Sequence, residues 1–182
     1  MMEREALERD VRQLLSVVPR DPDRQVAGGA DDDELADLER RLDRSLPGEL
    51  IDWLRVCKGE AIGPGGLYGA RPDVSHLDMA EELNHHNNWR TRGWLPIAGD
   101  GCGNAYVLIT ERGSTGGVGF VDTMTDVEAI DYIVASDLWH FLRFLLLRET
   151  GHQGWPFDQQ AVVAADPGMA EMPGPLLPWR DA

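Results

Sequence analysis

Apolar residues in the first part of the chain follow the 3.6-residue period of an α-helix. Leucine and valine recur at intervals of three and four over residues 3–18, which predicts an amphipathic helix. A linker rich in proline and glycine follows at 19–30. The acidic run 31–34 then lies where the positive end of a helix dipole favours carboxylates, so we expect it to cap a second helix over the following leucines.

The pattern between residues 47 and 89 is more broken. Proline suits the first position of a helix and glycine suits its end, so Pro47 and Gly59 bracket a third predicted helix at 47–58. A glycine-rich loop and a short predicted strand at 67–71 come next. Residues 78–89 have helical character, although their apolar periodicity is weak.

From Trp94 onward the pattern becomes that of β-strands separated by glycine-rich turns. The turn at 100–104 is predicted to join two of these strands as a hairpin. The predicted strands are 94–98, 105–110, 117–123 and 129–134. Ser136 is then expected to cap a strongly apolar helix that ends at Gly151.

The last segment, 151–182, combines five prolines with two tryptophans. Proline disfavours helix and tryptophan favours burial, so we expect an extended strap packed on the domain. A polyproline II ligand for a partner is the alternative. The sequence therefore divides into an N-terminal helix and linker (1–30), a central domain (31–150) and this strap.

Charge narrows the possible partners. The 182 residues are 42% hydrophobic, enough for a folded core, and carry 32 acidic against 17 basic side chains, a net charge of −15. Nucleic-acid and anionic-membrane binding rely on basic residues, so the composition disfavours both and favours a basic protein partner. Acidity that serves solubility alone is the alternative. No secretory or membrane-spanning pattern is present, which predicts a cytoplasmic protein.

The residues that most often carry chemistry form no recognised motif. Adjacent histidines on a helix point about 100° apart, so His85 and His86 predict no metal site. Cys57 falls on a buried helix face, and Cys102 has no histidine close in sequence to act as a base. The run Gly113–Gly119 lacks the lysine of a phosphate-binding loop and is predicted to be a turn. We therefore expect no catalytic residues, metal or cofactor.

Three stretches together resemble the SUKH superfamily, which includes the yeast Smi/Knr cell-wall regulators and many bacterial immunity proteins. The first is DDDELADLERRLDRSLPGELIDWLRVCKGE, with its acidic helix, Leu-Pro and second helix. The second is WLPIAGDGCGNAYVLIT, similar to the family's central hairpin, and the third is VGFVDTMTDVEAIDYIVASDLWHFLRFLLL. The resemblance covers roughly residues 31–150 and rests on the order and spacing of these pieces.

The resemblance implies a single α+β domain, in which helices pack against a mostly antiparallel β-sheet. It also implies a protein that binds rather than catalyses, as a bacterial immunity protein neutralises a cognate toxin, often a nuclease. A scaffold or regulatory module of the same fold that binds an endogenous protein is the alternative. A third possibility is an enzyme or small-ligand binder that uses the glycine-rich rim of the sheet.

Binding residues concentrate on loops and at strand ends. The acidic, aromatic and amide residues at such positions are the candidates for partner contact: Glu60, Tyr68, Trp94, Asp100 and Asn104. For the two aromatic residues the alternative, that they belong to the core, stays open.

Overall fold

An antiparallel sheet lies at the middle of the molecule in the computed structural model, which describes residues 4–20, 26–110 and 116–180. Its strands occur in sequence order, each antiparallel to the next: β1 (Trp94–Gly99), β2 (Ala105–Ile109), β3 (Val118–Val121) and β4 (Tyr132–Ala135). The predicted α+β fold with an antiparallel sheet is confirmed. Pro96 lies in β1, an edge strand, where proline is tolerated because one side of the strand has no ladder partner.

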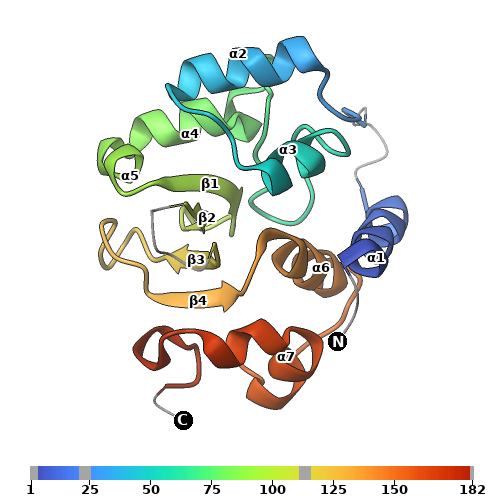
Figure 1. Cartoon of the computed structure of the whole chain (residues 1–182), viewed down its shortest axis with the longest axis vertical. Coiled ribbons are helices and arrows are strands. Elements are labelled where there is room, and N and C mark those ends of the chain that lie inside the picture. Colours follow the sequence, from blue (N-terminus) through green and yellow to red (C-terminus); the bar gives the residue numbers. More distant parts are fainter. Residues whose placement is uncertain (1–3, 21–25, 111–115, 181–182) are drawn as a thin grey trace.

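The helices surround this sheet (Figure 1). α4 and α5 pack against β1, α2 packs on α4, and α1 and α3 pack on α6. Because helices lie around it, β1 is buried at every position. The α-helices of the described residues are α1 (Arg4–Val17), α2 (Asp32–Leu42), α3 (Gly48–Leu54), α4 (Met79–His85), α5 (Asn87–Thr91), α6 (Leu138–Glu149) and α7 (Gln159–Ala165). The short 3₁₀ helices are η1 (Ser75–Leu77), η2 (Pro167–Glu171) and η3 (Gly174–Leu176).

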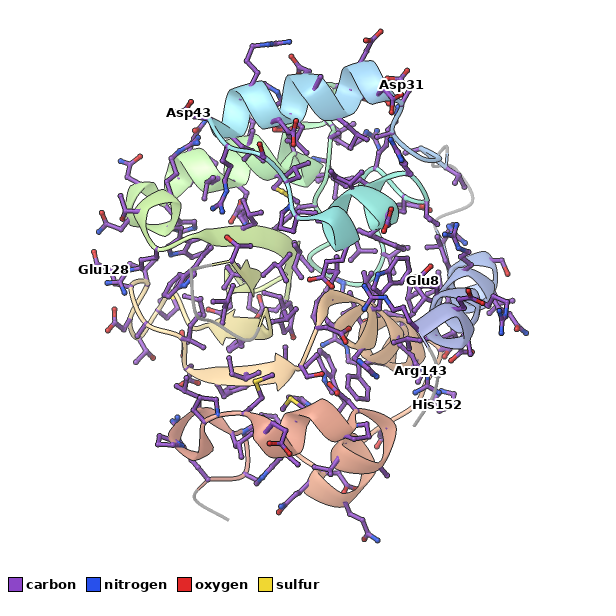
Figure 2. All side chains as sticks on the ribbon, viewed as in Figure 1. Glu8, Asp31, Asp43, Glu128, Arg143 and His152 are labelled. Carbon is purple, nitrogen blue, oxygen red and sulfur yellow. The ribbon has the colours of Figure 1, made fainter. Side chains whose placement is uncertain are left out.

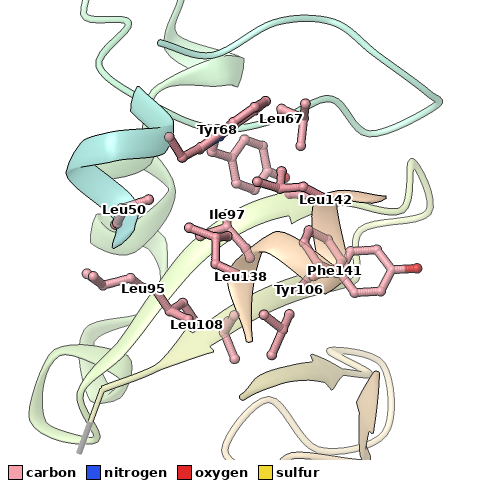
Figure 3. Packing of buried hydrophobic residues seen from close by; sticks show 14 of the residues in the cluster. Leu50, Leu67, Tyr68, Leu95, Ile97, Tyr106, Leu108, Leu138, Phe141 and Leu142 are labelled. Carbon is pink, nitrogen blue, oxygen red and sulfur yellow. The ribbon is translucent and has the colours of Figure 1, made fainter. Parts of the chain in front are cut away.

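The core of the domain forms between α6 and the sheet. Leu138, Phe141 and Leu142 of α6 are at most 1% exposed (Figure 3). Phe141 packs against Tyr106 of β2, with ring centroids 5.1 Å apart. A fully buried leucine or phenylalanine contributes roughly 1.5–3 kcal/mol through the apolar surface that it removes from water. Packing of this apolar helix is therefore a main source of stability.

The acidic run before α2 acts as a helix cap, as predicted. The Asp31 carboxylate accepts a hydrogen bond from the backbone N–H of Glu34 at 2.8 Å, and the Glu34 carboxylate accepts one from the N–H of Asp31 at 3.0 Å. This reciprocal pair satisfies two backbone donors at the start of the helix. The N-cap Asp31 and the C-cap Asp43 flank the two ends of α2 in Figure 2.

Two boundaries in the region 47–71 differ from the prediction. Pro47 is the N-cap rather than the first helical residue. α3 ends at Leu54, after which the N–H of Val56 bonds to the carbonyl of Trp53 and the N–H of Lys58 to the carbonyl of Gly28. The strand predicted at 67–71 is absent. Leu67 forms isolated bridges with residues 60 and 98, while Gly69 pairs with residue 78. Since each residue bonds to a different neighbour, no ladder develops.

The cap of α6 is also corrected. Asp137, not Ser136, is the N-cap, and its carboxylate accepts from the N–H of His140 at 2.9 Å. Ser136 instead donates both its N–H and its hydroxyl to the fully buried carboxylate of Asp166, at 2.7 and 2.5 Å. Both residue types cap helices well, so the neighbouring acid from the tail decides which one does so here.

The tail packs on the domain, but the expected extended conformation is wrong. It folds into α7, η2 and η3, with Val162 and Met169 buried and the Trp155 indole N–H donating to the carbonyl of Val134 at 2.8 Å. Pro167 and Pro175 stand in the first turns of η2 and η3. A proline there loses no hydrogen bond, because the first N–H groups of a helix have no partner within it.

Candidate binding site

A hollow of about 600 Å³ opens at the end of β1 where the strand enters the β1–β2 turn. Its walls come from three separate parts of the chain: the loop at 64–68, the region of η1 and α4, and the turn at 99–104. Its volume lies within the range of ordinary ligand pockets, roughly 300–1,000 Å³. We call this feature the acidic hollow, for the carboxylates that line it.

Close backbone packing holds the first and third walls together. A Cβ atom added to Gly65 would lie 2.2 Å from the carbonyl carbon of Gly99, and one added to Gly101 would lie 2.6 Å from Pro64. Gly101 also has φ of +84°, a conformation that side chains rarely adopt. Glycine is therefore required at both positions for the loop and the turn to meet.

The turn itself is built around Asp100, as the predicted hairpin requires. Its carboxylate accepts from the N–H of Cys102 at 2.7 Å, the N–H of Asn104 at 3.0 Å and the Asn104 amide at 2.8 Å. The side-chain amide oxygen of Asn104, Oδ1, in turn accepts from the N–H of Thr123 at 3.1 Å. These bonds fix the third wall and link it to the end of β3.

The second wall, formed by the region of η1 and α4, is held in place by a buried carboxylate. Asp78 is fully buried and accepts two hydrogen bonds from the Arg41 guanidinium, at 2.7 and 3.0 Å. It also accepts from the N–H groups of Arg71 and Glu81, each at 3.0 Å. As the N-cap of α4, Asp78 sets the direction in which the first turn of this helix presents Glu81 and Glu82 to the hollow.

The electrostatic character of the acidic hollow is negative. Glu81 and Glu82 line it, Asp100 lies between two lining glycines, and neither arginine nor lysine is among the described lining residues. Burial raises the pKa of the Tyr68 hydroxyl, and the nearby charges of Glu82 and Asp100 raise it further. The phenol is therefore a neutral hydrogen-bonding group on the wall of the acidic hollow.

His86, beside α4, does not offset this charge at neutral pH. His86 stacks on Trp89 with ring centroids 3.9 Å apart, and burial lowers its pKa, so it is neutral. His85 is exposed, with Nδ1 3.9 Å from a Glu82 oxygen. Across the described residues, no three histidine, cysteine or acidic side chains are grouped to hold a metal ion.

The structure brings together three of the five candidate residues. Tyr68 and Asn104 line the acidic hollow, and Asp100 shapes it. Glu60 does not: it is 7% exposed and forms an ion pair with Arg20. Trp94 lies at the opposite end of β1, 5% exposed.

Both aromatic candidates belong to the hydrophobic core. Trp94 packs against Trp89 with ring centroids 6.3 Å apart, and the Arg92 guanidinium lies 5.2 Å from the centre of its ring. Tyr68 differs because it also faces the acidic hollow. A role in partner contact stays a prediction for all five candidates.

Sequence reasoning missed Glu81 and Glu82. They lie in a short helix whose apolar periodicity is too weak to predict which of its faces is exposed. Nothing in the local sequence relates them to Tyr68 or Asn104. The one available signal was Asp78, an N-cap residue followed three positions later by Glu81. Recognising the site would have required knowing that α4 lies beside the β1–β2 turn.

The cysteines and the glycine run show no further site. Cys57 is buried, which raises its pKa to about 11 and keeps the thiol protonated, whereas Cys102 is exposed on the turn. The run Gly113–Gly119 lies partly outside the described residues; Gly116 and Gly117 precede β3, and the last two residues of the run belong to this strand. Within the described ranges, the helices are too short or too polar to cross a membrane.

Together, the fold and the hollow define a single α+β domain with a carboxylate-lined recess at one end of its sheet. Residues 29–143 match the model of the SMI1/KNR4 family (SUKH-1), and the chain belongs to this family, as the resemblance predicted. Members of this family typically bind protein partners and are generally non-catalytic. No curated protein matches the chain. α1 and the tail lie outside the family match.

Proposed function

We propose that this protein is a non-catalytic binding domain, an immunity protein that occupies the basic surface of a cognate toxin of the nuclease type. The observation that carries the proposal is the acidic hollow. Its carboxylates, Glu81, Glu82 and the adjacent Asp100, stand without an arginine or lysine among the lining residues described. A recess of this kind complements a basic loop.

The charge of the whole chain supports the same class of partner. At a net charge of −15, the protein attracts a basic partner before contact and increases the rate of association. Nucleases hold phosphate groups with basic side chains, so an acidic protein can compete for the same surface. Tyr68 and Asn104 add neutral hydrogen-bonding groups within the recess, which favours a defined fit over unspecific attraction.

The test begins with proteins that co-purify from the source cells at low salt and elute as salt rises. The partner is then purified, and its affinity is measured for the wild type and for E81Q/E82Q. We expect the double variant to weaken binding at least about tenfold and to flatten its salt dependence, because two interfacial charges are lost. Glu81 makes no ion pair in the described chain, and Glu82 has only His85 and His86 within 4.0 Å, at 3.9 and 3.5 Å, so we expect the exchange to leave the domain folded.

The matched control is D52N/E171Q, which removes two exposed carboxylates outside the hollow. Equal weakening by both double variants would mean that net charge alone matters and would remove the hollow from the proposal. Added protein should also inhibit the partner's nuclease activity. Capture of an endogenous partner with no toxic activity would instead identify a scaffold or regulatory module.

A further inference from the structure

A second hollow, of about 500 Å³, lies at the other end of β1, between the C-terminal end of α2 and α5. Two arginines line it, together with Thr91, Gly93 and Thr110, and we call it the arginine hollow. Asp43, labelled in Figure 2, stands on its wall. The acidic hollow opens where β1 ends, so the two sites are separated by the length of a strand.

The two arginines differ from the other cations of the protein. Arg44 and Arg90 have no carboxylate within 4.0 Å, and among the cations of residues 4–20, 26–110 and 116–180 this is shared only with the exposed Arg12. In a chain with nearly twice as many acids as bases, two partly buried arginines without a carboxylate partner are unexpected. Even Asp43 forms no ion pair with either of them.

Neutral groups hold both guanidiniums in place. Arg44 donates through Nη2 to the Thr110 hydroxyl at 2.6 Å, and Arg90 donates to the Leu42 carbonyl at 2.7 Å and to the Asn84 side chain at 2.6 Å. These bonds orient the charges without neutralising them. Further N–H groups, Nη1 of Arg44 and Nε of Arg90, make no hydrogen bond within the described chain and are not buried.

Arg44 also has a buried polar atom, Nε, without a hydrogen-bond partner among the described residues. Burial lowers the pKa of the guanidinium, and no nearby acid offsets the effect. A charged group that is partly desolvated and unpaired is destabilising, and such a group usually has a functional reason to be kept.

We propose that the arginine hollow binds a phosphate-type dianion. Two positive charges match a phosphate group, which carries about −1.5 to −2 at neutral pH, whereas a single carboxylate would leave one charge uncompensated. Guanidinium groups present paired donors that fit phosphate oxygens. The volume of the arginine hollow exceeds that of one phosphate group and leaves room for a small organic substituent. The bound group is therefore either free phosphate or the phosphate of a small monoester.

The test measures thermal unfolding against inorganic phosphate, phenyl phosphate and acetate at constant ionic strength. Saturable stabilisation by phosphate, and not by acetate, is expected, since only a ligand that binds the folded state shifts the transition in this way. Tighter binding of phenyl phosphate identifies an organic monoester, and equal binding identifies free phosphate. No saturation, or equal effects of phosphate and acetate, would overturn the proposal.

Variants locate the site. R44Q and R90Q should each weaken phosphate binding by about tenfold or more, through the loss of charged hydrogen bonds. R12Q, which removes an exposed arginine that likewise has no carboxylate partner among the described residues, should leave phosphate binding unchanged. Equal loss in all three variants would show unspecific attraction.

A measurement on the wild type guards against variants that fail to fold. Phenylglyoxal modifies accessible arginines, and modification at each position is followed by mass spectrometry. Phosphate should protect Arg44 and Arg90 several-fold against the reagent, while Arg12 reacts equally with and without phosphate. Protection of none of them would contradict the proposal.

Discussion

Asp78 joins three segments that are distant in the sequence. Its carboxylate receives hydrogen bonds from Arg41 of α2, from the backbone before η1 and from the first turn of α4. The Arg41 side chain is only 25% exposed, so this pair is substantially shielded from water. Hydrogen bonds that reach a buried carboxylate from several directions stabilise its charged form and order the segments that supply them.

Replacing Asp78 should therefore destabilise the protein strongly. D78A leaves two backbone N–H groups without partners and removes both Asp78 hydrogen bonds from the partly buried Arg41 guanidinium, which then keeps only Asp37. We expect a loss of about 3–5 kcal/mol in the free energy of unfolding. Urea denaturation measures it. The control is D73N, which disrupts the pair between Arg71 and an exposed carboxylate and should cost about 1 kcal/mol or less. Similar losses for both variants would contradict the role given to Asp78.

His140 is a second residue of interest, because its neighbours determine its pKa. Burial alone would lower its pKa, but the 2.9 Å hydrogen bond to Asp137 and the charges of Asp137 and Asp166 outweigh burial and the opposing charge of Arg143, so its pKa is raised. Burial likewise opposes the Asp137 charge, yet His140 and Arg4 hold the pKa of Asp137 below its usual value. The two residues stabilise each other as an ion pair.

The contribution of this pair should depend on pH in a defined direction. Because the pKa of His140 is raised in the folded state, protonation stabilises the folded protein. This stabilisation is fully present when the pH is below the unfolded pKa of histidine, near 6.5, and is lost as the pH rises through the folded pKa. H140Q should therefore reduce the free energy of unfolding by roughly 1 kcal/mol more at pH 6 than at pH 8.5. Urea denaturation at both values checks this, with H152Q, an exposed histidine, as the control. A difference of the opposite sign would refute the assignment.

At the scale of the element, the tail completes the aromatic core. Trp155 stacks on Phe144 with centroids 5.9 Å apart and contacts Tyr106 and Phe141, while the Arg148 guanidinium lies 5.4 Å from the centre of its ring. Its indole N–H is bonded to β4. One side chain thus joins the tail to α6 and to the sheet.

Loss of this side chain should loosen the tail before the rest of the domain. We expect W155A to cost about 2–4 kcal/mol, because it removes a half-buried ring and leaves the Val134 carbonyl without its donor. Amide hydrogen exchange should accelerate first in α7 and η2. F157A, which truncates an aromatic side chain that is 60% exposed, should have little effect on either measurement. Uniform acceleration across the domain would mean that the tail does not open separately.

The elements also show what sequence reasoning can and cannot predict here. α1, α2 and the strands were found because their periodicity or turn chemistry is local. The cap at Asp137 depends on Asp166, and the missing strand at 67–71 depends on bridges that Leu67 and Gly69 form with different parts of the chain. The acidic hollow was found only in part for the same reason, since Glu81 and Tyr68 meet only in the folded domain.

At the scale of the whole molecule, the outer edges of the sheet are occupied. Beyond β1, the N–H of Tyr68 donates to the Ile97 carbonyl at 2.9 Å and the N–H of Gly99 donates to the Gly66 carbonyl at 3.1 Å. Beyond β4, the tail supplies the Trp155 indole to the Val134 carbonyl. Many proteins recognise peptides by adding them to a free sheet edge as a further strand. Where these edges are covered, a partner is recognised through side chains and surface shape, and copies of the chain are kept from joining strand to strand.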